Sequence, residues 1–459
     1  MRRRWIQGGG HRRAMRRTVY IILLALSAGA GVGAAHKPPR AHELHTAYSH
    51  EEYATAFGKR YAGEAARKVA AANFAASLGK ILAHNSKPGT SWKMGLNHMS
   101  DWSPEERAAL NGFKSSGALP AEDEDSKEIP GPSSSAAAAA TLPAELDWRA
   151  CTPFAEGGSL RSLCPLVELP AEPVVTPPKF QGNCGSCWAF GTAQAVESAF
   201  ALKAGWAREL APQQLVSCVH SFEACDGRGG CTGADPKEAL EYLMGAQKVL
   251  DPKRNGSDLV VGLVDEWSYG YTSGDALLPG VLGQSPSSVC RFDKIKAGVD
   301  PEEDIIGHTG AVALSGYTVS RNNYTELQSL LASKGPPVTI MAMTEDFVHY
   351  ESGVYTNCGY DPADSHGSML LNHAVQLVGY GTDAETGLDY WTVRNSFSSV
   401  WGDHGYFRVL REAETTCGVT RSIRTWCHDE DDAVVTPTCG CTGIATVAYF
   451  PTIGDLAVA

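Results

Sequence analysis

A cysteine at the expected start of a helix is the residue of this chain best suited to nucleophilic chemistry. Cys187 lies in Gln181-Gly-Asn-Cys-Gly-Ser-Cys-Trp-Ala-Phe, and the pattern that follows predicts a helix to about Ala204. The unpaired N–H groups and the dipole of a helix N-terminus favour the thiolate, the reactive form of cysteine. Cys187 could alternatively form a disulfide, because Cys184 is close in sequence. The odd total of 13 cysteines and the helix-start position favour a free thiol.

A thiolate needs a partner that moves protons, and one of the 14 histidines suits that role. His373 precedes an apolar, strand-like segment, and a second such segment runs through 388–395 after a Gly/Asp/Thr turn. A hairpin symmetric about Ala384 sets His373 opposite Asn395, within reach of a side-chain hydrogen bond. An amide oxygen bound to one ring nitrogen leaves the other for Cys187. Alone, the two residues would more simply be a half-buried histidine and a turn asparagine; their expected opposition favours the chemical role.

The elements that must position these residues follow an α+β pattern. Residues 45–85 have helical character, with apolar side chains three and four apart, and strands dominate after Val312. A charged, Ser/Ala-rich stretch without an apolar period indicates an exposed, cleavable linker. We divide the chain into a signal peptide (1–35), an N-terminal module (36–114), a linker (115–141), a helix-rich lobe (142–300) with an insertion at 151–178, a β-rich lobe (301–427) and a C-terminal extension (428–459).

The first residues predict the compartment. Arginines up to Arg17 precede a short apolar run and then small residues through Ala35, the order of a secretory signal peptide. A retained signal anchor is disfavoured, because the run is shorter than the roughly 20 residues that span a bilayer. The sequons at Asn255 and Asn323 suit the same route. We expect an extracellular, lysosomal or vacuolar protein with no stable membrane span after signal removal.

Charge and composition exclude several partners. The 459 residues carry a net charge of -12, so no broad basic surface for nucleic acid is expected. Cys439-Gly-Cys441 could bind a metal ion, but no histidine cluster accompanies it and the route is oxidising. We therefore expect a monomer with neither a metal nor another cofactor.

Four separated segments resemble the papain family of cysteine peptidases. They are Gln181 to Phe190, Asn372-His-Ala-Val, Asn395-Ser-Phe with Trp401-Gly and Gly405-Tyr-Phe, and Leu142-Pro followed by Asp147-Trp-Arg. The N-terminal module resembles the inhibitory propeptide of that family through Phe74, Ile81, Asn85 and Gly95-Leu-Asn97-His-Met99-Ser-Asp101. The resemblance implies a two-lobed, papain-like fold. It also implies a zymogen whose propeptide lies backwards through the cleft until the chain is cut near 130–141.

The resemblance also implies roles for single residues. Cys187 attacks the scissile carbonyl, His373 moves the protons, and Asn395 orients His373. The Gln181 side chain and the Cys187 N–H form the oxyanion hole. Gly233 resembles a glycine whose backbone binds extended substrate. An apolar preference is expected for the second residue before the scissile bond, and the expected substrate-binding residues are Gly233, Ala234, Ile340, Asn372, Trp401 and Ser422.

This chain departs from the family pattern at several positions. Phe397 stands where the family usually has Trp covering the His–Asn hydrogen bond, so weaker shielding is expected. Ala234 and Asp235 stand where the family often has Gly and an aromatic residue, and Asp235 would favour a basic side chain. The insertion at 151–178 and the tail after Cys427 also differ.

The family resemblance implies three disulfides and leaves Cys187 free. The implied pairs are Cys184–Cys231, Cys218–Cys290 and Cys358–Cys417. The other six cysteines allow many pairings, among which the sequence does not choose. They are Cys151, Cys164, Cys225, Cys427, Cys439 and Cys441.

These observations together predict a papain-like cysteine endopeptidase that is made as a secretory zymogen, acts on polypeptides and is inhibited by its own propeptide. Endopeptidase activity is favoured because the sequence has no histidine-bearing loop or minichain that would cap the cleft. The alternatives are an inactive homologue used for binding or storage, and an exopeptidase or transpeptidase that uses the same site.

Overall fold

The computed structural model describes fifteen stretches of the chain between residues 38 and 454. They are 38–115, 142–153, 162–166, 168, 170–219, 229–245, 249–250, 257–258, 262–274, 290–291, 294–295, 311–359, 369–412, 417–421 and 435–454. The predicted signal peptide, the cut region at 130–141, Ser422 and Asn255 lie outside them. Within the described stretches, no helix has the length and apolar character needed to cross a bilayer.

The N-terminal module is built from helices and one short strand. Ser49 and Ser103 accept hydrogen bonds from backbone N–H groups of the first turns of α1 and α3, which starts these helices at their capping residues. The long helix α2 buries a face that includes Phe74, Leu78 and Ile81. The elements are η1 (Ala41–Glu43), α1 (His50–Ala56), α2 (Glu64–Asn85), β1 (Trp92–Met94) and α3 (Pro104–Ala108).

The helix-rich lobe is organised around α4 (Cys187–Ala204), whose bounds agree with the helix expected from the sequence. Most of α4 is buried, because it packs against α5, α6 and the strands β8 and β13. Gln376 on β8 ties the two elements by donating to the Gln194 carbonyl at 2.9 Å. The other elements are α5 (Pro212–Cys218), η6 (Gly230–Thr232), α6 (Pro236–Leu243), β3 (Val249–Leu250) and β4 (Ser257–Asp258).

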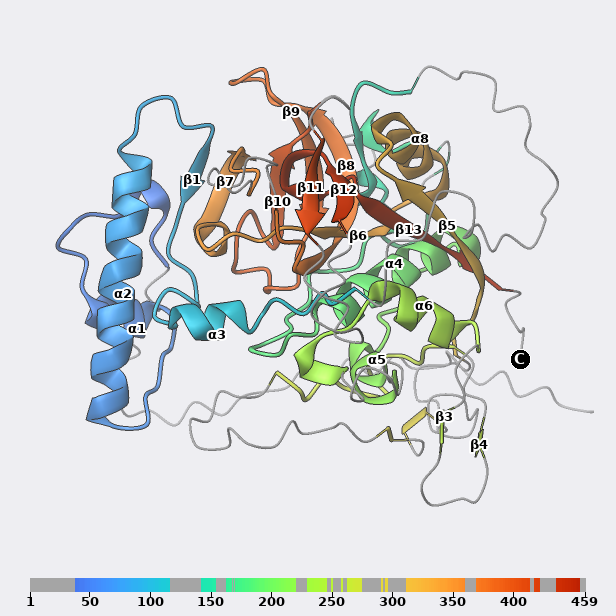
Figure 1. Ribbon diagram of the computed structural model, residues 1–459, viewed down its shortest axis with the longest axis horizontal. Coiled ribbons are helices and arrows are strands. Elements are labelled where there is room, and N and C mark those ends of the chain that lie inside the picture. The colour runs from blue at the N-terminus through green and yellow to red at the C-terminus, as the bar shows by residue number, and fades with distance from the viewer. Residues whose placement is uncertain are drawn as a thin grey trace, which may run out of the picture. The chain divides into compact units, whose positions relative to one another are not determined.

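A nine-stranded sheet forms the second half, in the order β1-β7-β10-β9-β8-β6-β13-β5, with β2 paired to β8. Strand β1 comes from the N-terminal module, which lies beside β7 in Figure 1. The strands are β2 (Leu146–Asp147), β5 (Leu314–Arg321), β6 (Val338–Met341), β7 (Tyr350–Tyr355), β8 (His373–Thr382), β9 (Asp389–Arg394), β10 (Tyr406–Leu410) and β13 (Val447–Ile453). Short helices connect them: η2 (Trp148–Ala150), α8 (Tyr324–Lys334), η7 (Phe347–His349) and η8 (Cys441–Gly443).

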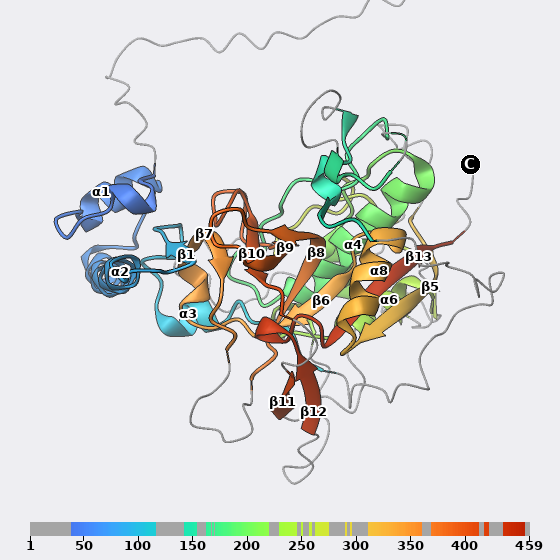
Figure 2. The same ribbon diagram turned by 90° about the horizontal axis from the view of Figure 1, so that it is seen from above.

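Strand β13 near the C-terminus belongs to the sheet, which corrects the expected C-terminal extension that begins at 428. Strand β13 lies between β6 and β5 and pairs with both. The segment before it forms a separate hairpin of β11 (Cys417–Arg421) and β12 (Val435–Cys439). Figure 2 shows this hairpin standing apart from the sheet. The sequence analysis missed β13 because its apolar run follows the hairpin, after the recognisable family motifs end.

The same hairpin explains a wrong disulfide assignment. Cys184–Cys231 and Cys218–Cys290 are present as expected, but Cys358 is bonded to Cys441 and not to Cys417. Cys417 lies opposite Cys439 in the hairpin. The η8 turn brings Cys441 to Cys358, and the Thr442 N–H donates to the Cys358 carbonyl at 3.1 Å. A fourth disulfide, Cys151–Cys164, closes part of the predicted insertion.

Candidate active site

Cys187 is free and fully buried at the first position of α4. Its Sγ accepts two backbone hydrogen bonds, from the Gly112 N–H at 3.3 Å and from the Ala374 N–H at 3.4 Å. Burial raises the pKa of the Cys187 thiol to about 11, although these backbone N–H groups oppose the shift. The sequence predicted an acidified thiol, but in this form the chain covering it outweighs the helix end, so the thiol is neutral.

His373 and Asn395 are in contact, and both are fully buried. His373 Nε2 lies 2.9 Å from Asn395 Oδ1. Burial lowers the pKa of His373 to about 4, while the hydrogen bond to Asn395 acts in the opposite direction. His373 Nδ1 is buried without a hydrogen-bond partner. The Ala374 N–H donates to Cys187 Sγ, and His373 directly precedes Ala374 in the chain. The imidazole therefore belongs to the neighbour of a residue that contacts the thiol.

The predicted register of the hairpin is wrong, although the predicted contact exists. Strands β8 and β9 pair Gln376 with Arg394, and a bulge follows between Leu377 and Gly379. Continued to the strand ends, this register sets His373 across from Phe397 and not from Asn395. The shift arises because the turn, where Thr382 pairs with Asp389, is centred further along than Ala384. The bulge adds a residue to β8 and offsets only part of this shift.

Phe397 shields the His–Asn hydrogen bond despite being smaller than tryptophan. Its ring centroid lies 5.2 Å from that of His373, with an interplanar angle of 36°. Trp401 packs on the other side at 5.4 Å, and Phe397 is 1 % exposed. The expected loss of shielding therefore does not occur in this form. Trp401 is buried as well and donates to the Val348 carbonyl at 2.8 Å, so it supports this wall from within.

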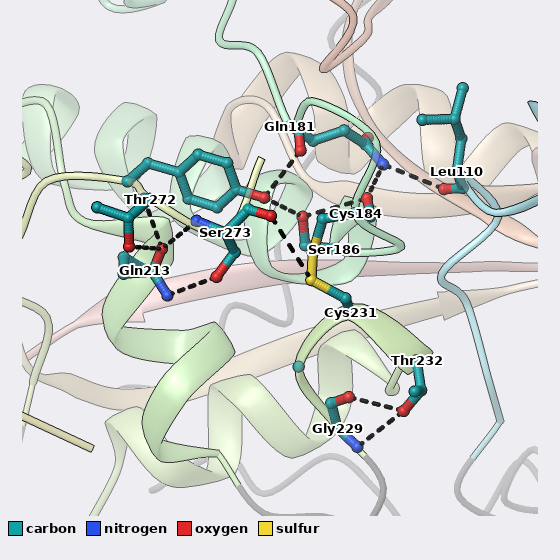
Figure 3. The surroundings of a disulfide bond; sticks show 12 residues. Leu110, Gln181, Cys184, Ser186, Gln213, Gly229, Cys231, Thr232, Thr272 and Ser273 are labelled. Atoms are coloured by element: carbon teal, nitrogen blue, oxygen red, sulfur yellow. Dashed lines mark hydrogen bonds between the residues drawn. A yellow bond between two sulfur atoms is a disulfide. The ribbon is translucent and has the colours of Figure 1, made fainter. Parts of the chain in front are cut away.

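The side-chain amide of Gln181 is held in one orientation. Ser396 Oγ donates to Gln181 Oε1 at 2.5 Å, which turns the amide nitrogen toward the cleft. That nitrogen donates to the Cys184 carbonyl at 2.7 Å and to the Leu110 carbonyl at 3.1 Å, as Figure 3 shows. Leu110 belongs to the N-terminal module. The sequence analysis missed Ser396, whose position directly after Asn395 was its only signal.

Residues 110–114 of the N-terminal module pass through the site, beginning in the turn that ends α3 and pairing with the protease at the single bridge of Phe113. Ala234 N donates to the Gly112 carbonyl at 3.0 Å, and Lys114 N donates to the Ala234 carbonyl at 3.2 Å. Phe113 pairs in parallel with Ala234, and its N–H donates to the Asn372 carbonyl at 3.0 Å. A peptide strand therefore lies directly over the thiol.

Ala234, and not Gly233, makes the main-chain hydrogen bonds to this strand. The expected substrate-binding role of Gly233 stays a prediction. Gly233 has a φ of 106°, and a Cβ there would lie 2.6 Å from the Gly112 carbonyl oxygen. A glycine is required at this position for conformation and for close approach. Asp235 is 2 % exposed and caps α6 by accepting from Lys237 N at 2.9 Å.

The remaining predicted residues lie in different places. Ile340 on β6 is buried in the same apolar cluster as Phe113. The Asn372 side chain binds Met343, accepting from its N–H at 2.8 Å and donating to its carbonyl at 3.1 Å. Asn323 is exposed and caps α8. In the part of the chain that the structure describes, no three His, Cys, Asp or Glu side chains are grouped to hold a metal ion.

Comparisons with known proteins agree with this architecture. The papain family cysteine protease model matches residues 168–426, and the cathepsin propeptide inhibitor domain matches residues 50–107. The chain is 31 % identical to pro-cathepsin H of Medicago truncatula, over 82 % of this chain and 85 % of that protein. It is 30 % identical to thiol protease aleurain of Arabidopsis thaliana, over 79 % of each chain.

Solved structures show the same arrangement of propeptide and protease. Digestive procathepsin L2 from the larval midgut of Tenebrio molitor has a TM-score of 0.58 and 26 % identity, with 88 % of this chain and 98 % of that chain covered. Procathepsin L3 from the same source has a TM-score of 0.56 and 25 % identity, covering 87 % and 97 %. With its free cysteine under a propeptide strand, the chain belongs to the papain family of cysteine proteases and carries a cathepsin-type inhibitor propeptide.

Proposed function

We propose that this cysteine protease is a secretory zymogen that hydrolyses peptide bonds through an acyl-enzyme. Cys187 is the nucleophile, His373 donates a proton to the leaving amine and then activates water, and Asn395 orients the imidazole. Gln181 and the Cys187 N–H stabilise the oxyanion. The cut that activates the chain falls at 130–141.

The strand over the thiol is the observation that carries this proposal. Gln181 Nε2 donates to a peptide carbonyl, that of Leu110, while the same segment donates to Cys187 Sγ through Gly112. A peptide that binds in this cleft therefore meets an amide donor and a sulfur atom side by side, the two groups that acyl transfer requires. Both the thiol and the imidazole are neutral beneath the strand, which is consistent with an inactive precursor.

The side chain of Phe113 indicates which substrates fit. Phe113 is 7 % exposed and belongs to an apolar cluster that includes Ala234, Ile340 and Leu371. A substrate side chain in this pocket would gain the same burial, about 2–3 kcal/mol for a large apolar group. We propose that the enzyme prefers an aromatic or large aliphatic side chain at the second residue before the scissile bond.

The insertion at 151–178 supports endopeptidase activity through the contact that its described part makes with the helix-rich lobe. Glu172 accepts from the Ala207 N–H at 2.8 Å. Ala207 lies just beyond the C-terminal end of α4, and Cys187 lies at the other end of this 18-residue helix. The two ends are about 27 Å apart at 1.5 Å per residue. That contact lies at the end of α4 away from Cys187, and we propose that the cleft accepts chains that continue in both directions.

The test is incubation of the purified precursor at about pH 4–5, near the pKa values of carboxyl groups. Intact mass will show cleavage near 130–141. Hydrolysis of peptides that differ only in the second residue before the scissile bond will show the substrate preference. The Cys187→Ser variant should stay intact and should lose at least about 1,000-fold of the hydrolysis. A thiol alkylator should label mature Cys187 rapidly, and His373→Ala should slow this labelling.

Three outcomes would contradict the proposal. A precursor that stays inert after another protease removes its propeptide would favour an inactive binding or storage homologue. Release of only single residues or dipeptides from chain ends would favour an exopeptidase, and formation of a new amide with an added amine would favour a transpeptidase.

A further inference from the structure

A cluster of buried charges lies beneath the site and is not used by the proposed mechanism. Its centre is Glu197 on α4, which is 0 % exposed. Glu197 Oε1 lies 3.1 Å from Lys179 Nζ and accepts from the Leu210 N–H at 2.8 Å. Glu197 Oε2 accepts from the Thr176 hydroxyl and lies 3.7 Å from Nη2 of Arg394, which is also 0 % exposed. One carboxylate therefore holds two buried cations and a hydroxyl.

The members of this cluster lie on the same chain segments as the functional residues. Glu197 is on the helix that begins at Cys187. Lys179 comes two residues before Gln181, and Arg394 directly precedes Asn395. The cluster thus joins the three chain segments that supply the nucleophile, the oxyanion donor and the residue that orients the imidazole.

Main-chain contacts transmit the position of the cluster to the site. Ser398 N donates to the Lys179 carbonyl at 2.9 Å, and Gln181 N donates to the Ser396 carbonyl at 2.9 Å. The segments 179–181 and 396–398 therefore form one unit, while Arg394 Nη1 donates to Thr176 Oγ1 at 2.8 Å. Glu197 links this unit to α4 through its ion pairs with Lys179 and Arg394.

Buried ion pairs of this kind influence the geometry of catalytic groups more than the affinity for substrate. Removing Glu197 leaves Arg394 without its carboxylate partner in a low-dielectric interior, while Lys179 keeps only Glu266 and Glu209. The segments then shift until Arg394 finds water or another acceptor. A shift on the order of 1 Å between catalytic groups can cost up to about a hundredfold in rate.

We propose that Glu197, through Lys179 and Arg394, is a positioning residue for catalysis that sets Gln181 and Asn395 relative to Cys187. This inference rests on the proposed roles of those three residues. It assigns Glu197 an effect on the turnover of bound substrate and little effect on substrate binding, because no member of the cluster touches the cleft segment 110–114.

The test is a double-mutant cycle on the mature enzyme, with rates counted per alkylator-titrated site. Glu197→Gln and Arg394→Met should each lower kcat about tenfold and change KM less than about twofold. The double variant should lose no more than either single variant, because both remove the same interaction. Arg394→Lys keeps the charge and should recover most of the lost kcat.

The matched control is Arg408→Met, which removes an arginine that pairs with Asp383 at 2.7 Å on the partly exposed side of β10. It should leave kcat within about twofold. Where Glu197→Gln does not fold, Thr176→Val removes the hydroxyl that donates to the same carboxylate and accepts from Arg394, and it should lower kcat about threefold.

An unchanged kcat per titrated site, with only a lower Tm, would overturn the proposal and leave the cluster a structural role. Independent, additive losses in the cycle would overturn it as well. If the wild-type mature enzyme itself neither titrates nor hydrolyses peptides, the proposed function fails instead, so the two failures are distinguishable.

Discussion

The propeptide contacts the protease in two regions that are held by different forces. The cleft strand, residues 110–114, is held mainly by main-chain hydrogen bonds to Ala234, Asn372 and Cys187. The module before it, residues 38–108, docks on β7 through strand β1, through apolar packing such as that of Trp92 on Tyr355, and through titratable side chains such as Lys80. Main-chain amides do not change charge with pH, whereas histidines and carboxylates do.

The docked module contains histidines that are neutral because they are buried. Burial lowers the pKa of His98 to about 3, and nearby Lys59 lowers it further while Asp101 opposes this. The ring of His98 stands edge to face on Phe180 at 5.1 Å and on Trp102 at 6.1 Å, and neither ring nitrogen has a partner. On the protease side, burial lowers the pKa of His349 to about 3.

This difference teaches that inhibition and its response to pH are separable. We expect the cleft strand to block the thiol at any pH, and the module to set the pH at which the strand is released. Three substitutions in the full-length precursor test this separation, each read as the rate at which an alkylator labels Cys187 before any cleavage, with intact mass as the check.

Gly112→Ala should have the largest effect. A Cβ at Gly112 would lie 1.9 Å from the Gly185 carbonyl oxygen, so the strand has to leave the cleft. Overpacking of this kind costs about 1–3 kcal/mol, which predicts labelling that is faster by about tenfold to a hundredfold at neutral pH. The matched control is Gly79→Ala in α2, where a Cβ meets nothing within 4 Å. Equal labelling of the two variants would show that the strand does not block the thiol.

His98→Phe should have an intermediate effect that depends on pH. A released His98 regains a pKa near 6.5, so release takes up a proton between about pH 6.5 and 3. Docking with histidine therefore weakens as pH falls through that window, and phenylalanine removes this loss. Labelling at pH 5 should be about tenfold slower in His98→Phe than in the wild type, with little difference at pH 8. An unchanged pH profile would assign the response to other groups.

Lys80→Met should have the smallest effect. Lys80 pairs with Glu345 across the interface at 2.7 Å, but the two side chains are 39 % and 57 % exposed. A hydrogen bond from Lys80 lowers the pKa of Glu345, so this pair contributes above about pH 4.5 and is lost as the carboxyl protonates at lower pH. Exposed pairs contribute little, so labelling at pH 7 should rise less than about threefold. A larger rise would show that charge, and not packing, contributes most of the free energy of docking.

Much of the fold and of the site followed from local patterns. The helix beginning at Cys187 and the strands around His373 and Tyr390 were predictable in this way, while the pairs Cys184–Cys231 and Cys218–Cys290 were implied by the family resemblance. The partner of Cys358, the strand β13 and the β8–β9 register were not. These depend on where an inserted hairpin, a tail and a bulge place the chain, and residue spacing carries no information about that.

The sequence by itself determined which groups are available for chemistry at this site, because helix starts, strand periods and the order of Cys, His and Asn are local properties. Only the tertiary structure decided the protonation state of these groups. The propeptide strand excludes water from Cys187 and His373, and this desolvation leaves both neutral where the helix end alone would favour a thiolate. Burial depends on what distant segments cover, and only the folded chain brings Gly112 onto the sulfur.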